Sequence, residues 1–311
     1  MSRDVAIVSF ASTAVPGTDL GETQLLYPII TEAIEGAGVK RDEIQFTCSG
    51  SADYLAGAPF AFVSNLEATG AWPPISESHV EMDGAWALYE AWVRLQHGDV
   101  DVALAFSSGL SSRSANLRET LVLQLDPYYL MPLWVDQVSI AALQAQAMGR
   151  DDTVAELAAV EGASRRDGAA AAILVAGDRA RQLSERPVWI RGIDHRAEIH
   201  YPGMRDLATS SSTAIAGEHV GVGNGAIDVA ELHAPFAHQE QILREALKLG
   251  DDVDVNPSGG AATENPAMVA GLIRIGEAFR QISQNGKRRA VAHATSGPAL
   301  QQNLVCVLEG E

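Results

Sequence analysis

The side chains best suited to acid–base chemistry lie in a few short segments of the chain. Two carboxylates, Glu81 and Asp83, come directly before a segment with helical spacing. Such a carboxylate can transfer a proton, or it can cap the helix by accepting backbone N–H bonds, which is worth about 1 kcal/mol. His233 follows an apolar segment, and an imidazole there can move protons near neutral pH or be a hydrogen-bonded structural residue. The residues alone leave these alternatives open.

A glycine-rich turn at 256–260, Asn-Pro-Ser-Gly-Gly, precedes a segment whose apolar residues repeat at about 3.6 residues. We expect a helix there with Pro266 in its first turn, where a missing N–H costs nothing. N–H groups at a helix start favour an anion or a developing oxyanion. The alternative is an ordinary loop-to-helix junction. The candidate binding residues of this turn are Ser258, Gly259 and Gly260.

The composition of the chain excludes several classes of protein. The 311 residues include 22 Lys and Arg against 40 Asp and Glu, a net charge of −18, which argues against nucleic acid and anionic membranes as partners. Only two cysteines are present, Cys48 and Cys306, which fits a reducing cytoplasm and no disulfide framework. We expect no signal peptide, no membrane span and no metal site, because no apolar run is long enough and no ligand cluster has the spacing.

Apolar segments with strand and helix periodicity alternate along the chain, which predicts an α/β protein with a mostly parallel sheet. Between residues 107 and 165 this alternation of strands and helices is interrupted by a serine-rich loop and a partly apolar segment. We call residues 107–165 the excursion. The expected strands are 5–10, 44–48, 100–106, 167–175 with its preceding turn, 188–193, 227–232, 290–294 and 303–309. The expected helices are 23–37, 83–96, 136–148, 152–162, 237–248 and 266–280.

Four segments in order, 83–105, 167–172, 231–236 and 256–260, resemble motifs of the thiolase superfamily. The resemblance implies two fused five-stranded α/β halves in an α-β-α-β-α sandwich, with a shortened loop domain. The implied domains are residues 1–106 with 166–186 for the first half, 107–165 for the loop domain and 187–311 for the second half.

The chain departs from the thiolase pattern at the residues that carry the chemistry. Glu81 stands where the nucleophilic cysteine belongs, and Asn265 takes the place of the catalytic histidine. The segment 292–297, which includes Ser296 and Gly297, has no second cysteine. Formation of an acyl-enzyme needs a polarizable thiolate, so these departures argue against ordinary thiolysis.

A cysteine-less chain of this kind resembles the lipid-transfer-protein, or sterol-carrier, type of thiolase homologue. That resemblance implies a cytoplasmic lyase that cleaves a β-hydroxyacyl-CoA, such as a steroid side chain, by a retro-aldol reaction. It also implies a homodimer with 100–106 near the interface, a small OB-fold acyl-CoA-binding partner, and no cofactor beyond the coenzyme A of the substrate. The alternatives are a non-catalytic acyl-CoA- or lipid-binding subunit and an acyltransferase with an atypical nucleophile. The expected site comprises His233, Glu81, Asp83 and Asn265 for chemistry, and Ser258, Gly259, Gly260, Ser296 and Gly297 for binding.

Overall fold

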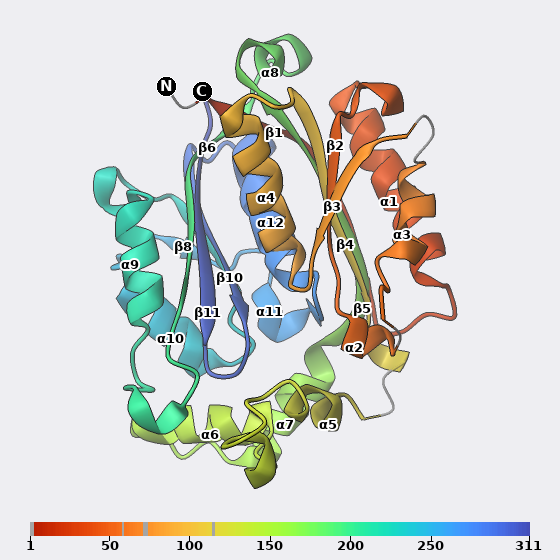
Figure 1. Ribbon diagram of the computed structural model, residues 1–311. Coiled ribbons are helices and arrows are strands. Elements are labelled where there is room, and N and C mark those ends of the chain that lie inside the picture. Colours follow the sequence, from red (N-terminus) through yellow and green to blue (C-terminus); the bar gives the residue numbers. More distant parts are fainter. Residues whose placement is uncertain (1–2, 58, 71–73, 114–115) are drawn as a thin grey trace.

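A computed structural model describes residues 3–57, 59–70, 74–113 and 116–311, and its sheet strands follow one continuous path (Figure 1). One half of the path belongs to the first part of the chain and the other half to the second, and they meet where β1 pairs with β6. A short further strand, β9 (Asn265–Pro266), pairs with β5. The order along the path is β3 (Ser76–Val80), β2 (Phe46–Gly50), β4 (Val102–Leu110), β5 (Arg165–Ala176), β1 (Val5–Val15), β6 (Val188–Ala197), β11 (Gln302–Glu309), β10 (Arg289–Ser296), β7 (Val229–Leu232) and β8 (Asp254–Val255).

Helices form three layers around the two halves of the sheet. The central layer contains α4 (Gly84–His97) and α12 (Ala270–Ser283), which lie between the halves (Figure 1). Helix α1 (Glu22–Ala37) packs on the outer face of the first half, and α10 (Ala237–Ala246) on that of the second. This arrangement confirms the predicted sandwich. The remaining helices are α2 (Asp53–Ala56), α3 (Val63–Thr69), α5 (Leu117–Val122), α6 (Gln137–Ala147), α7 (Val154–Ser164), α8 (Gly177–Leu183), α9 (Ser211–His219) and α11 (Gly260–Thr263), with 3-10 turns at 41–43, 111–113, 131–133, 202–204 and 222–224.

The segment that forms β4 is a continuous apolar run because both faces of this strand are buried. Because successive side chains of a strand point to opposite faces, Ala103 and Ala105 face the central helices, whereas Val102, Leu104 and Phe106 face α1. Both faces are buried, so alternation with polar residues is not needed.

Small residues allow α4 and α12 to approach the strands and each other closely. A Cβ added at Gly84 would lie 2.3 Å from Ser107 Oγ and 2.9 Å from a methyl carbon of Leu272. A Cβ at Gly271 would lie 2.6 Å from that of Ala294. All three distances are well inside van der Waals contact, so larger residues would force the layers apart. The predicted close packing of the two central helices is confirmed.

Three local predictions were wrong. The second central helix begins at Ala270 rather than at 266, because Met268 has φ +64° and Pro266 is paired with β5. The sheet is mixed rather than mostly parallel, since β4 pairs in parallel with β2 but antiparallel with β5. The edge of the first half is formed by β3, which the sequence analysis missed because its residues Ser-Glu-Ser-His-Val are mostly polar.

The excursion between β4 and β5 contains α5, α6 and α7, which lie together at one end of the molecule (Figure 1). Val138 and Ala141 of α6 and Leu157 of α7 pack on Phe236, which follows β7. The excursion is thereby anchored beside the carboxyl end of β7. In the described part of the chain, no helix is both long and apolar enough to cross a membrane.

Candidate active site

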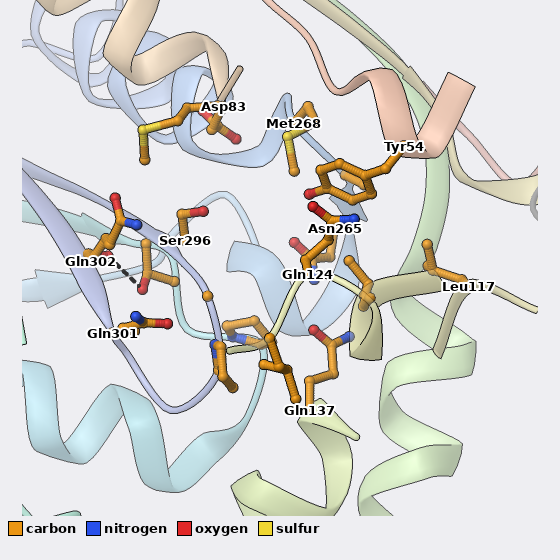
Figure 2. A pocket seen from close by; sticks show the side chains of 18 of the residues that line it. Tyr54, Asp83, Leu117, Gln124, Gln137, Asn265, Met268, Ser296, Gln301 and Gln302 are labelled. Atoms are coloured by element: carbon orange, nitrogen blue, oxygen red, sulfur yellow. Dashed lines mark hydrogen bonds between the residues drawn. The ribbon is translucent and has the colours of Figure 1, made fainter. Parts of the chain in front are cut away.

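A cavity of about 520 Å³ lies between the excursion and the ends of the central strands and helices. Its wall is built from both halves of the fold and from the excursion, and Figure 2 shows side chains from these parts facing one space. Six of the residues predicted from sequence line it: Glu81, Asp83, His233, Asn265, Ser296 and Gly297.

His233 and Asn265 form a hydrogen-bonded pair in the wall of the cavity. The backbone N–H of Thr295 donates to His233 Nδ1 at 3.3 Å, so Nδ1 is an acceptor and the neutral ring carries its proton on Nε2. Nε2 lies 3.0 Å from Asn265 Oδ1 and therefore donates to it. The amide of Asn265 is thus oriented by its neighbour, and its Nδ2 has no hydrogen-bond acceptor among the described residues.

The surroundings of His233 keep its ring neutral. The residue is 7% exposed at the end of β7, and its backbone N–H donates to His293 O at 3.2 Å. Burial lowers the pKa of His233 to about 4, and the bond to Asn265 opposes this only in part. The expectation that His233 titrates near neutral pH is therefore wrong. With both ring nitrogens engaged, the geometry fits positioning of Asn265 better than direct proton transfer.

Asp83 joins the N-termini of the two central helices. Its Oδ1 accepts from the backbone N–H groups of Ala85 at 2.8 Å and Leu272 at 3.0 Å, and its Oδ2 accepts from that of Gly271 at 2.9 Å. Burial raises the pKa of Asp83 to about 6, although these three bonds favour the charged form. Asp83 therefore acts as a helix cap, the second of the two alternatives, and it caps both α4 and α12.

The glycine-rich turn lies outside the cavity wall. Ser258 donates to Glu231 Oε2 at 2.7 Å and accepts from Arg274 at 2.7 Å, and Arg274 pairs with Glu231 at 3.0 Å. Gly259 and Gly260 have φ of +96° and +63° and lead into the single helical turn α11, rather than into α12. The expectation that Ser258, Gly259 and Gly260 line the binding site is not met, because the turn packs behind β7 and the N-terminus of α12 is filled by Asp83.

Glu81 faces the cavity near Tyr54 of α2. Its carboxylate accepts a hydrogen bond from the backbone N–H of Asp53. Partial burial raises the pKa of Glu81, and burial together with the charge of Glu81 raises that of Tyr54 to about 12. Tyr54 was missed in the sequence analysis, since it lies in a Ser-, Gly- and Ala-rich segment without a motif.

No family profile and no curated protein matches the sequence. Among solved structures, human mitochondrial 3-ketoacyl-CoA thiolase superposes with a TM-score of 0.75 and 15% identity over 99% of each chain. The chain has the thiolase fold. The human mitochondrial 3-ketoacyl-CoA thiolase in complex with CoA superposes with a TM-score of 0.74 and 14% identity. The match covers 99% of this chain and 98% of that one.

Neither of the two cysteines of the chain lines the cavity. Cys48 lies in β2 and Cys306 in β11, both fully buried in the core that surrounds the central helices. Burial raises the pKa of both thiols, that of Cys48 to about 12. Neither is available as a thiolate at neutral pH. Among the described residues, no group of three or more His, Cys, Asp and Glu is placed to hold a metal ion.

Proposed function

We propose that this thiolase-fold protein is a carbon–carbon lyase that cleaves a β-hydroxyacyl-CoA by a retro-aldol reaction. The observation that carries the proposal is the orientation of Asn265, whose Nδ2 has no acceptor among the described residues and lies in a cavity that contains no thiol. A donor fixed in this way can stabilise the oxygen of an enolate, whereas it cannot replace a covalent nucleophile. The fold likeness supports an acyl-CoA-related role, since the superposed human enzyme is a 3-ketoacyl-CoA thiolase.

In the proposed reaction, the carboxylate of Glu81 takes the proton of the substrate β-hydroxyl. The bond between Cα and Cβ breaks, Cβ becomes the carbonyl carbon of a ketone or aldehyde, and the electron pair moves to the thioester oxygen as an enolate. Protonated Glu81 then returns the proton to Cα, which gives a shortened acyl-CoA. Glu81 is suited to both steps because its raised pKa brings its acid and base forms closer to neutral pH.

The other site residues hold the donors in place. Asn265 Nδ2 and the hydroxyl of Ser296, which has no partner among the described residues, are the proposed donors to the enolate oxygen. His233 fixes the amide of Asn265, and Asp83 fixes the starts of α4 and α12, directly after the wall segments 81–83 and 265–268. Gly297, at φ +75°, turns the chain directly after Ser296, and a Cβ there would lie 2.6 Å from Gln301 Oε1.

The charges near the cavity support a partner protein for the coenzyme A moiety. Arg165 in the cavity wall donates to Glu161 at 2.9 Å, and Arg118 on α5 pairs with Asp136. These cations are already neutralised, and the whole chain carries a charge of −18. A partner protein would add positive charge for the CoA phosphates to that of Arg205, which donates to Pro298 O beside the cavity and makes no ion pair among the described residues; we therefore propose the predicted small OB-fold acyl-CoA-binding subunit. We further propose a cytoplasmic homodimer that pairs through the free edge of β3.

Product analysis tests the proposal. The protein, with its partner present, is incubated with a β-hydroxyacyl-CoA that bears a steroid side chain, and the products are separated by chromatography. Equal amounts of a ketone or aldehyde and a shortened acyl-CoA, with unchanged intact protein mass, are expected. A stable acyl adduct on the protein would support an acyltransferase instead. Tight binding without any cleavage would support a non-catalytic acyl-CoA-binding subunit.

A further inference from the structure

Arg165 is a cation in the cavity wall to which the proposed reaction gives no part. It is the first residue of β5, directly after α7, and its side chain is 29% exposed. Its Nη2 donates to Glu161 Oε1 at 2.9 Å, whereas Nε and Nη1 have no acceptor among the described residues, and Nε is buried. Partly buried donors that the protein does not satisfy are suited to hydrogen bonds with a ligand.

Strand pairing brings Arg165 next to Asn265. The short strand β9 pairs in parallel with β5, and in this pairing Arg165 and Asn265 are direct partners. Because successive side chains of a strand alternate between faces, paired residues project to the same face of a sheet, and both of these line the cavity. Nδ2 of Asn265 also has no acceptor among the described residues. Two neighbouring side chains therefore offer unused donors to one space.

The ion pair with Glu161 holds the guanidinium of Arg165 and leaves most of its donors unused. Glu161 is 7% exposed and lies one helical turn before Arg165, so α7 fixes the position of its carboxylate. A partly buried cation without a counter-ion is costly, and Glu161 reduces that cost through a single N–H of the guanidinium. A pair that only closed the end of α7 would be worth about 0.3–0.5 kcal/mol and would not require a place beside Asn265.

We propose that Arg165 is a further catalytic residue, which donates together with Asn265 to the oxygen that becomes negative when the carbon–carbon bond breaks. The thioester oxygen is uncharged in the substrate and receives the electron pair of the broken bond in the enolate, while the hydroxyl proton passes to Glu81. A fixed positive charge beside this oxygen binds the enolate more strongly than the substrate, which is the condition for a faster chemical step. The inference rests on the proposed lyase function and adds a residue to it.

The first test is the kinetics of cleavage of a β-hydroxyacyl-CoA with the partner protein present. Arg165→Gln should lower kcat by about 10²–10³ with little change in KM, since the interaction is made with the enolate and not with the substrate. Arg165→Lys keeps the charge without the planar fork and should restore part of the rate. Glu161→Gln keeps every donor of Arg165 and should lower kcat much less than Arg165→Gln does.

The matched control is Arg179→Gln. Arg179 on α8 also pairs with a glutamate, Glu43, but it lies outside the cavity, and α8 and α7 are at opposite ends of the molecule (Figure 1). This variant loses a comparable ion pair and should cleave the substrate at the wild-type rate.

The second test needs no cleavage. Acetoacetyl-CoA loses a proton from Cα to solvent and forms an enolate, which is followed by its near-ultraviolet absorbance. The wild-type protein should raise the enolate fraction of this probe. Arg165→Gln should reduce the effect about ten- to a hundredfold, because hydrogen bonds from charged donors are worth that much, whereas Arg179→Gln should leave it unchanged.

The outcomes separate the role of Arg165 from the lyase function. Cleavage by Arg165→Gln near the wild-type rate, or equal losses of kcat in Arg165→Gln and Glu161→Gln, would overturn the role and leave the lyase function standing. Absence of cleavage by the wild type would overturn the lyase function, and the enolate of acetoacetyl-CoA then decides the role alone. Equal enolate absorbance with the wild type and with Arg165→Gln would overturn it. If Arg165→Gln does not fold, Arg165→Lys takes its place, and an unchanged kcat and enolate absorbance in that variant would overturn the role.

Discussion

Replacement of Asp83 by alanine should destabilise the protein well beyond the loss of an ordinary helix cap. The carboxylate of Asp83 accepts N–H bonds from Ala85, Gly271 and Leu272, the first of which lies in α4 and the other two in α12. Each buried N–H left without an acceptor costs about 1–3 kcal/mol, or about 6 kcal/mol for the three. Burial disfavours the charged carboxylate and raises its pKa to about 6, so its removal recovers part of this cost. We expect a net loss in the free energy of unfolding of about 3 kcal/mol, at the lower end of the range for the three N–H groups.

Denaturant unfolding at pH 8 measures this loss, with Thr153→Ala as the control. Thr153 caps only α7 and accepts a single N–H bond, from Glu156, so its replacement should cost about 1 kcal/mol. The folded-state pKa of Asp83 lies above its unfolded value, so its contribution to stability is greatest at low pH and falls as pH rises through about 6. The difference between wild type and Asp83→Ala should accordingly be larger at pH 5 than at pH 8. A loss in the free energy of unfolding no greater than that of Thr153→Ala would refute the proposal that Asp83 holds α4 and α12 together.

Three further predictions concern the site and the assembly. For His233 the folded-state pKa of about 4 lies below the unfolded value of 6.5. Its contribution to stability is therefore complete above pH 6.5 and is lost, by about 3 kcal/mol, as pH falls through 4. In His233→Gln the pH dependence of the free energy of unfolding should lack this loss, and an unchanged pH dependence would contradict the assignment. Glu81→Gln should lower the rate of carbon–carbon cleavage by about 10²–10⁴ with folding intact, and a rate near wild type in a stopped assay would exclude Glu81 as the base. Light scattering should give a mass near twice the 32.9 kDa of one chain, whereas a monomer at micromolar concentration would argue against pairing at β3.

The sequence predicted most of the fold because its signals are local. The small and apolar residues of α4 repeat at helical spacing, and the buried run of β4 has strand length, so both elements were recognised. The polar strand β3 was missed because a half-exposed edge strand has no apolar run. The start of α12 was misplaced, since the extended conformation of Pro266 depends on pairing with β5, a hundred residues earlier in the chain.

The candidate site was predictable only where a motif marked it. His233 and Asn265 were found from motifs, but their mutual hydrogen bond and the depressed pKa of His233 arise from burial in the folded chain. The second helix that Asp83 caps lies 188 residues later in the sequence, and a contact of that sequence separation cannot be predicted from a local pattern. Gln137 and Tyr54 reach the cavity from segments without motifs, so nothing in the sequence singled them out.

The proposed donor role of Asn265 is tested by the rate of carbon–carbon cleavage of Asn265→Asp relative to wild type. Asn265 Nδ2 is the proposed donor to the enolate oxygen, and its orientation is fixed by the bond from His233 to Oδ1. An aspartate keeps the size and the acceptor for His233 but replaces the donor by a second acceptor. Loss of one such donor is worth about 10²–10³ in kcat, so a fall of at least that size is predicted, with the thermal unfolding temperature nearly unchanged. Cleavage by Asn265→Asp at close to the wild-type rate would contradict the account.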